Sequence, residues 1–285
     1  MATRVDTAFV RIIFILLVSG NVWISIDSLG KSLDKGLDKS IGYVRILSFN
    51  NAGVNPVFAE NGRKSQVRIP GTGAHVFGLQ EVASQAVPEF FGYTRFTGIW
   101  TGSEHLPIYF QADRFKLIGS LSHTLDIDVR DQFIYDGVVY GPFQRGFNAI
   151  RLRDTFHNKI LVIINTHLGI GGSAPDQSDE VLALSESFRE GADVVVYLGD
   201  FNHDLLNPSE QIPPPGFLDS NCRRDLTPTK PVSYGNEEGA IIDYLFFKGS
   251  HVSAIAYRVA GEIYSDHYGV SADIKYLAGN CGSYP

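Results

Sequence analysis

The chain has 285 residues, of which 44% are hydrophobic and 19% are charged. This composition is enough for one large domain with a buried core, and it excludes a chain that is disordered throughout. The formal net charge of −7 excludes a whole-molecule attraction to nucleic acid or anionic membranes. A polyanionic substrate would therefore have to be held locally, by a metal ion or a small basic patch.

The N-terminal segment has the pattern of a targeting signal. Arg4 and Arg11 precede an apolar run at residues 12–18, and the small residues Ser19 and Gly20 follow it. This pattern predicts a signal peptide, and if residues 21–26 are counted with the run, an uncleaved membrane anchor is the alternative. We expect a secreted or extracytoplasmic protein, or one that this segment anchors to a membrane.

The segment that follows is expected to be a linker. Residues 27–40 form a short charged near-repeat with leucine at every fourth position, and they contain two glycines, Gly30 and Gly36. We therefore divide the chain into a signal peptide or anchor at 1–26, a linker at 27–40 and one folded domain at 41–285. Cys222 and Cys281 are the only cysteines, and they form either one disulfide in an exported protein or two unpaired thiols. Neither belongs to a Cys-x-x-Cys pair, so a zinc knuckle is not indicated.

Buried strands separated by loops dominate the rest of the sequence. Apolar runs this continuous are typical of strands that are covered on both faces, and an amphipathic helix is predicted at 177–188. The pattern favours two packed sheets with helices outside them. The predicted strands are residues 43–49, 76–79, 106–110, 160–164, 194–198, 241–247 and 268–274.

Polar side chains recur at the ends of these strands. A packed scaffold can present polar groups at strand ends without burying them, so we expect these residues to share one edge. Asp243 is the exception, because it lies within an apolar run and must have a partner to offset its burial. The residues at the strand ends are Asn50, Glu81, His167, Asp200, Asn202, Asp266 and His267.

The chemical character of this set indicates metal-assisted hydrolysis. Carboxylate and amide oxygens are the ligands that Mg²⁺ or Mn²⁺ prefers, and two histidines supply acid–base groups near neutral pH. The sequence contains no Gly-x-Ser-x-Gly elbow, no P-loop and no dinucleotide fingerprint. Serine hydrolase and nucleotide-binding chemistry are therefore not indicated.

Six ordered motifs resemble those of the endonuclease/exonuclease/phosphatase superfamily, which includes deoxyribonucleases and sphingomyelinases. They are Leu-Ser-Phe-Asn, Leu-Gln-Glu-Val, Asn-Thr-His-Leu, Gly-Asp-Phe-Asn, Ile-Asp-Tyr-Leu-Phe and Ser-Asp-His-Tyr, spread over residues 43 to 274. The resemblance implies that residues 41–285 are a catalytic domain. It also implies an α/β fold, a four-layer sandwich of two mixed β-sheets packed face to face with outer helices.

The resemblance also implies a role for each residue. Mg²⁺, with Mn²⁺ as an alternative, would be bound by Glu81 as principal ligand with Asn50 and Asp266 near it. Asp200 or His267 would deprotonate the attacking water, and both alternatives stay open. His167 would stabilise the transition state from the opposite side. The catalytic set is His167, Asp200, Asn202, Asp243 and His267, with Asp243 paired to His267.

Two residues after the aromatic-rich stretch 122–143 are candidates for substrate contact, Arg145 and Asn148, although an ordinary hairpin loop would also explain this segment. The stretch itself is either core or an exposed hairpin. Because no clear membrane-inserting tip is evident, we favour a secreted nuclease that cleaves DNA or RNA. The alternatives are a sphingomyelinase-type phospholipase C or another phosphoesterase and, with less support, a non-catalytic binding module. The expected partner is nucleic acid or a phospholipid substrate, with no obligate protein partner and a monomeric chain.

The two histidines are expected to face solvent at the sheet edge. On this hypothesis each is needed for the chemistry and neither is needed for folding.

Overall fold

The computed structural model describes residues 42–52, 69–83, 87–135, 137–170, 172–203, 218–219, 239–249, 252–260 and 265–276. The predicted targeting segment, the linker and both cysteines lie outside these residues. Within them, no helix has the length and apolar character needed to cross a membrane.

The first sheet has six strands in the order β13-β14-β1-β2-β4-β3. It is mixed, because β1 and β2 run parallel and the other neighbours run antiparallel. Its strands are β1 (Tyr43–Asn50), β2 (Val76–Gln80), β3 (Tyr93–Phe96), β4 (Ile108–Gln111), β13 (Val252–Ala260) and β14 (Gly269–Tyr276).

The second sheet also has six strands, in the order β11-β12-β10-β9-β8-β5. Here β9 and β10 are the parallel pair. Its strands are β5 (Phe115–Thr124), β8 (Gly146–Asp154), β9 (Lys159–His167), β10 (Val194–Asp200), β11 (Leu218–Asp219) and β12 (Asp243–Lys248).

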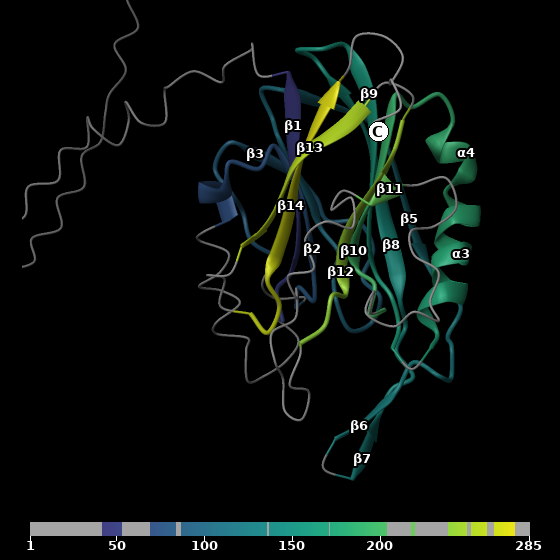
Figure 1. The fold of residues 1–285 in the computed structure, drawn as a ribbon. Coiled ribbons are helices and arrows are strands. Elements are labelled where there is room, and N and C mark those ends of the chain that lie inside the picture. The colour runs from purple at the N-terminus through teal and green to yellow at the C-terminus, as the bar shows by residue number, and fades with distance from the viewer. Residues whose placement is uncertain are drawn as a thin grey trace, which may run out of the picture. The chain divides into compact units, whose positions relative to one another are not determined.

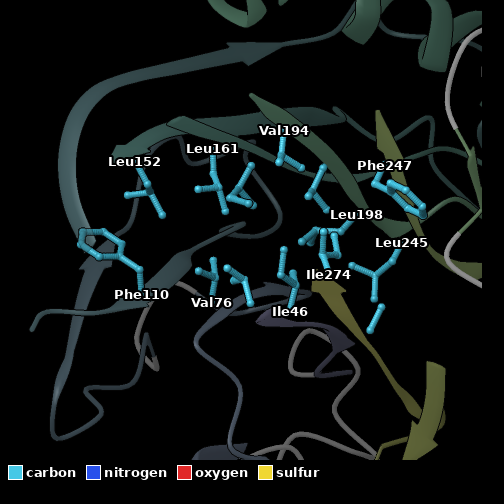
Figure 2. Close-up of a cluster of buried hydrophobic side chains, with 14 of the residues drawn as sticks. Ile46, Val76, Phe110, Leu152, Leu161, Val194, Leu198, Leu245, Phe247 and Ile274 are labelled. Carbon is cyan, nitrogen blue, oxygen red and sulfur yellow. The ribbon is translucent and has the colours of Figure 1, made fainter. Parts of the chain in front are cut away.

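The main hydrophobic core lies between the two sheets (Figure 2). Ile46 and Val76 of the first sheet belong to the same buried cluster as Leu161 and Val194 of the second. These strands are rich in β-branched residues, which suit a pleated surface that is buried on both faces. Their continuous apolar runs are therefore explained by cover on both sides.

Each sheet has a second apolar face that is also covered. Helices α3 (Ala174–Leu184) and α4 (Glu186–Arg189) lie beside the second sheet, where Val181 and Phe188 pack on its outer cluster (Figure 1). The 3-10 turn η1 (Ile69–Thr72) places Ile69 against the outer face of the first sheet. The predicted sandwich of two mixed sheets is confirmed, although the described residues contain few helices.

A short two-stranded hairpin extends from the body of the domain (Figure 1). It consists of β6 (Phe133–Tyr135) and β7 (Val138–Tyr140), and the side chains of Phe133, Ile134, Val138, Val139 and Tyr140 are exposed. Of the two alternatives for the aromatic-rich stretch, the structure therefore shows the exposed hairpin. The preference for a nuclease assumed that no membrane-inserting tip was evident, and the exposed apolar residues of this hairpin remove that reason.

The buried side chain of His75 makes the stability of the fold depend on pH. Its Nδ1 accepts a hydrogen bond from the backbone N–H of Arg45 at 2.7 Å. Burial, followed by the charges of Arg114 and Arg45, lowers the pKa of His75 from 6.5 to about 4. As pH falls below 6.5, the unfolded chain takes up a proton that the folded chain does not, so stability is lost between pH 6.5 and 4.

The loss of folding stability that His75 causes is expected to reach about 2–3 kcal/mol at pH 4. The control is His75→Asn, because its Oδ1 can still accept from the backbone and does not titrate. Urea unfolding of both proteins from pH 7 to pH 4 should show that the wild type loses more stability than the variant. If the free energy of unfolding fell by the same amount in both proteins, the pH dependence would not come from His75.

Candidate active site

Strand register brings the predicted polar residues to one end of the sandwich. Asn50 ends β1 beside the end of its parallel neighbour β2, and Glu81 follows β2 directly. In the second sheet, His167 at the end of β9 lies opposite Asp200 at the end of β10. Asp200 in turn lies opposite Asp243, the first residue of the antiparallel strand β12. The parallel strand pairs β1–β2 and β9–β10 therefore place their terminal residues at the same end of the sandwich.

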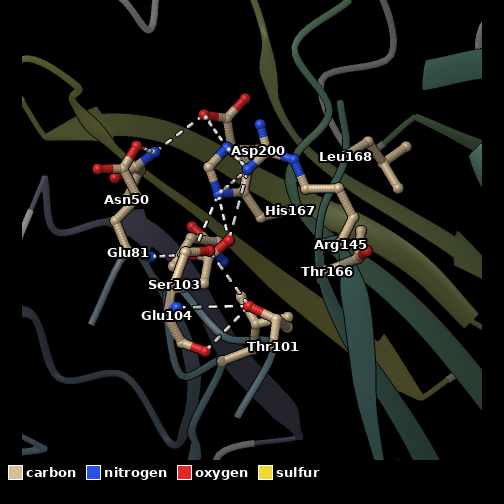
Figure 3. A network of polar contacts seen from close by, with 12 residues as sticks. Asn50, Glu81, Thr101, Ser103, Glu104, Arg145, Thr166, His167, Leu168 and Asp200 are labelled. Carbon is tan, nitrogen blue, oxygen red and sulfur yellow. Dashed lines mark hydrogen bonds and ion pairs between the residues drawn. The ribbon is translucent and has the colours of Figure 1, made fainter. Parts of the chain in front are cut away.

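The side chain of Asn50 connects the two sheets. Its Nδ2 donates to Glu81 Oε1 at 3.1 Å and to Asp200 Oδ2 at 2.9 Å (Figure 3). Its Oδ1 accepts from the backbone N–H of Ala52 at 2.9 Å, which fixes the orientation of the amide. Two carboxylates from different sheets are thus held within reach of one amide group.

Asp200 lies between the two histidines. Its Oδ2 is 3.6 Å from His167 Nε2 and 3.7 Å from His267 Nε2. Its Oδ1 accepts the backbone N–H of Asn202 at 2.8 Å. Gly199 allows this approach of β10 to β9, because a Cβ there would lie 2.0 Å from the carbonyl oxygen of Thr166.

Each histidine has a carboxylate within hydrogen-bonding distance of its Nδ1. His267 Nδ1 lies 2.8 Å from Asp243 Oδ2, so the partner that burial requires for Asp243 is this imidazole. His167 Nδ1 lies 2.8 Å from Glu104 Oε1. In both pairs the carboxylate fixes the ring and leaves Nε2 directed toward Asp200.

Glu104 is a member of this cluster that the sequence analysis missed. Its Oε2 also accepts the backbone N–H of Glu81 at 2.6 Å. Burial alone would raise the pKa of Glu104, but His167 and Arg145 hold it below its usual value. Glu104 comes from the loop between β3 and β4, where no buried run precedes it, so the strand-end signal that identified the other residues was absent.

The environment of His167 favours its protonated form. Burial and the charge of Arg145 act to lower the pKa of His167, whereas Glu104 and Asp200 act to raise it, and the net effect is a raised pKa. His167 is therefore suited to donate a proton or to stabilise negative charge.

Arg145, a candidate for substrate contact, lies beside His167. Its guanidinium binds Asp131 through two hydrogen bonds, Nε to Oδ2 at 2.7 Å and Nη2 to Oδ1 at 3.2 Å. Its Nη1 lies 3.2 Å from His167 Nδ1, and its charge lies 5.0 Å from the ring centroid of Phe143. Asp131 thus holds the guanidinium at the edge of the site.

Asn148 has a structural place instead of a substrate contact. It is fully buried, and its Nδ2 donates to the carbonyl oxygens of Thr97 and Leu106 at 3.0 and 2.8 Å. Its Oδ1 accepts from the backbone of Ile99 and the hydroxyl of Ser122. Because both ends of the amide are engaged in this way, Asn148 ties a loop of the first sheet to the second.

Asp266 and Asn202 reach the same end of the sandwich from loops. Asp266 is half-buried and follows Ser265, whose hydroxyl donates to the carbonyl oxygen of Asn50 at 2.7 Å. Asn202 Nδ2 lies 3.0 Å from His167 Nε2. Asn202 and Glu81 have φ angles of 48° and 53°, a left-handed conformation that is uncommon outside glycine and often marks functional sites.

The two histidines do not face solvent, so that expectation was wrong. His167 is 5% exposed and His267 is 2% exposed. Glu104, Arg145 and Asn202 surround the first ring, and Asp243 and Asp200 lie against the second. Both imidazoles are thus part of a packed polar network, and replacing either one will also affect stability.

The donor set fits a hard divalent cation. Burial, and to a smaller extent Glu104, raises the pKa of Glu81, which means that its charge is poorly compensated by protein groups alone. A cation beside Glu81 and Asp266 would supply that compensation through carboxylate oxygens. Asn50 would contribute an oxygen only if its amide turned over, because its Nδ2 faces Glu81 and its Oδ1 accepts from Ala52. Ligand atoms of Asp200, Asp243 and His267 also lie within 4.8 Å of one another. We favour a cation at Glu81 over one among Asp200, Asp243 and His267, because Asp243 and His267 already bind each other.

Comparison with solved structures identifies the fold. TDP2 from D. rerio, complexed with a single-strand DNA product, is 15% identical with a TM-score of 0.63, over 82% of this chain and 99% of its own. An endonuclease/exonuclease/phosphatase family protein from Bacteroides thetaiotaomicron is 16% identical with a TM-score of 0.61, over 85% and 98%. A mannosyl-6-phosphatase from the same organism is 16% identical with a TM-score of 0.60, over 82% and 100%. No protein-family model and no curated protein matches the sequence. At these identities the likeness establishes the fold.

Proposed function

We propose that this chain, which has the fold of the endonuclease/exonuclease/phosphatase superfamily, is a divalent-metal-dependent hydrolase of phosphate esters. One observation carries the proposal: two carboxylate–imidazole pairs face each other across Asp200, beside a group of oxygen donors. Hydrolysis of a phosphate ester needs a proton acceptor for water, stabilisation of the phosphoryl oxygens and a proton for the leaving oxygen. The cluster contains a group for each task.

The residues divide the reaction between two sides of the substrate phosphate. Asp200 and His267, with Asp243 behind it, form the relay that accepts the proton of the attacking water. On the other side, His167 stabilises developing charge or donates to the leaving oxygen, as its raised pKa allows.

The remaining donors hold the phosphoryl group. Asn202 Nδ2 and Arg145 Nη1 lie 3.0 and 3.2 Å from the ring nitrogens of His167, so both are placed to donate to phosphoryl oxygens that bind beside this ring. A divalent ion held by Glu81, with Asn50 and Asp266, would add positive charge to the phosphoryl oxygens.

The substrate class is the finer part of the proposal. The D. rerio neighbour supports the nuclease favoured from the sequence, because it was solved with a single-strand DNA product. The Bacteroides neighbour that is a mannosyl-6-phosphatase supports a sugar phosphate instead. One fold serves both, so similarity of fold does not select between them. Export of the chain is a further part of the proposal and rests on Arg4, Arg11 and the apolar run after them.

A parallel assay tests the proposed function. The purified protein, with Mg²⁺ or Mn²⁺, would be offered bis-nitrophenyl phosphate, nitrophenyl phosphate, plasmid DNA, RNA and sphingomyelin vesicles. We expect hydrolysis of bis-nitrophenyl phosphate and of at least one natural substrate, and we expect Asp200→Asn to lack both. A folded wild-type protein that cleaves none of the five would refute the proposal.

A further inference from the structure

A layer of polar side chains lies between the two sheets, next to the candidate active site. Every second residue of a strand faces the same side, so the residue two positions before His167 also points between the sheets. That residue is Asn165, and its register partner on β8 is Asn148. Two positions earlier on β9, Ile163 belongs to the main hydrophobic core. The polar layer therefore lies between the apolar core and the catalytic residues.

The side-chain amide of Asn165 connects the second sheet to the first. Its Nδ2 donates to the carbonyl oxygen of Leu79 at 2.9 Å, and to those of Leu106 and Pro107 at 3.1 and 3.3 Å. Its Oδ1 accepts from Gln80 Nε2 at 2.6 Å, and both amides are fully buried. The three carbonyl oxygens can only accept, so they determine which end of the Asn165 amide is the donor and thereby orient the Gln80 amide as well.

A glycine in β2 makes this connection possible. Glycine usually weakens the interior of a strand, and it often marks a close approach of another group. A Cβ at Gly78 would lie 2.7 Å from Asn165 Cγ and 2.5 Å from Leu198 Cδ1. Any larger residue at this position would force β2 away from the second sheet. Gly78 thus lets the amide of Asn165 reach the end of β2.

The hydrogen bond between Gln80 and Asn165 lies beside residues of the candidate active site. Gln80 immediately precedes Glu81, the proposed metal ligand on the first sheet, and Asn165 lies on the strand that ends at His167. Apolar contacts between sheets have no preferred direction, whereas a hydrogen bond is favourable over a narrow range of distance and angle. The two amides therefore set where Glu81 lies relative to His167.

We propose that Gln80 and Asn165 are positioning residues, which hold the oxygen donors of the first sheet and the acid–base groups of the second in the arrangement that the reaction needs. The inference rests on the proposed function and extends it to two side chains buried between the sheets. A displacement of about 1 Å in a reacting group can cost about 100-fold in rate, even when its cause lies away from the chemistry.

The double variant Gln80→Met with Asn165→Leu tests the proposal. The new side chains are similar in size to those they replace, and the loss of both partners of a buried hydrogen bond costs less stability than the loss of one. We expect kcat on bis-nitrophenyl phosphate to fall by about 100-fold while KM changes by less than about threefold. Gln80→Met alone is the milder variant, because the three bonds of Asn165 Nδ2 remain, and it should lower kcat in the same direction. Melting curves would establish that each protein is folded.

The matched control is Asn148→Ala, which loses buried amide hydrogen bonds from the same polar layer. The bonds of Asn148 go to Ser122 and to the loop before β4, away from the end of β2. This control should melt at a lower temperature and keep its kcat per folded molecule. A residue that only stabilises the fold would behave in the same way.

Imidazole nitrogen NMR of the metal-free protein gives a second readout that does not require turnover. Glu104 accepts the backbone N–H of Glu81 at 2.6 Å and lies 2.8 Å from His167 Nδ1. A shift of Glu81 relative to His167 therefore disturbs this chain of contacts and changes the His167 ring signals. We expect the change in the double variant and in Gln80→Met, and we expect Asn148→Ala to give the wild-type signals.

The outcomes separate the positioning role from the proposed function. If the wild type hydrolyses no phosphate ester, the proposed function fails, and the His167 signals still decide the positioning role. Wild-type signals in a folded double variant would overturn positioning, as would a raised KM with unchanged kcat. An equal change of these signals in folded Asn148→Ala would also overturn it, because the effect would then not be specific to the two amides.

Discussion

Replacing either His167 or His267 by alanine is expected to lower kcat by about 10²–10⁴-fold, the usual loss when an acid–base group is removed. Both Nε2 atoms lie within 3.7 Å of the same carboxylate oxygen of Asp200, so we expect both to act on one phosphoryl group. The double variant should therefore be less than multiplicatively worse than the single variants, because groups that act on one transition state are not independent.

The burial of both rings adds a cost in stability that the sequence-based hypothesis did not include. His267→Ala leaves Asp243, and His167→Ala leaves Glu104, without the imidazole it binds, which is expected to cost about 1–3 kcal/mol each. The control is Asn148→Ala, which also loses buried hydrogen bonds but lies outside the catalytic cluster. It should melt at a lower temperature and keep its kcat per folded molecule.

The measurements are kcat for the two single variants, the double variant and the control, each beside its melting curve. A folded His167→Ala or His267→Ala protein with kcat near the wild-type value would place the active site elsewhere. Loss of kcat in folded Asn148→Ala would mean that Asn148 also belongs to the catalytic cluster.

Replacing Glu81 by glutamine is expected to raise the Mg²⁺ concentration for half-maximal activity by about 100-fold or more. Residues behind metal ligands already contribute about 10–100-fold to affinity, and Glu81 is the proposed ligand itself. The substitution keeps the size of the side chain and removes its charge. Titration of activity with Mg²⁺, and of the protein with Mn²⁺ by calorimetry, would measure the shift with and without turnover.

The matched control is Glu186→Gln, an exposed carboxylate at the start of α4, away from the strand ends. It should leave both titrations unchanged. If Glu81→Gln and Glu186→Gln gave the same midpoint as the wild type, the cation would not be bound where we propose.

Much of the fold and of the site could be predicted because strand burial and strand ends leave local signals. Asn50, Glu81 and Asp200 each stand at the end of an apolar run, and a parallel pair of strands necessarily brings such ends together. Asp243 lies within an apolar run, and because an unpaired buried carboxylate is costly, a partner for it could be predicted. These inferences need only the neighbouring residues in the chain.

Other features could not be predicted because they depend on contacts between distant segments. Glu104 stands in an irregular loop and owes its place to His167, 63 positions later in the chain. Burial of the histidines arises from side chains of several loops closing over them. Exposure of the β6–β7 hairpin is equally hidden, because an apolar run such as 133–140 has the same local pattern whether a core covers it or nothing does.

The central claim is that this cluster hydrolyses phosphate esters with a divalent cation, and chelation tests it most directly. The purified wild-type protein would be assayed on bis-nitrophenyl phosphate before EDTA treatment, after it, and after Mg²⁺ or Mn²⁺ is returned. We expect turnover to disappear with the chelator and to return with either ion, while the melting curve shows a folded protein throughout. Full activity after exhaustive chelation would contradict the account.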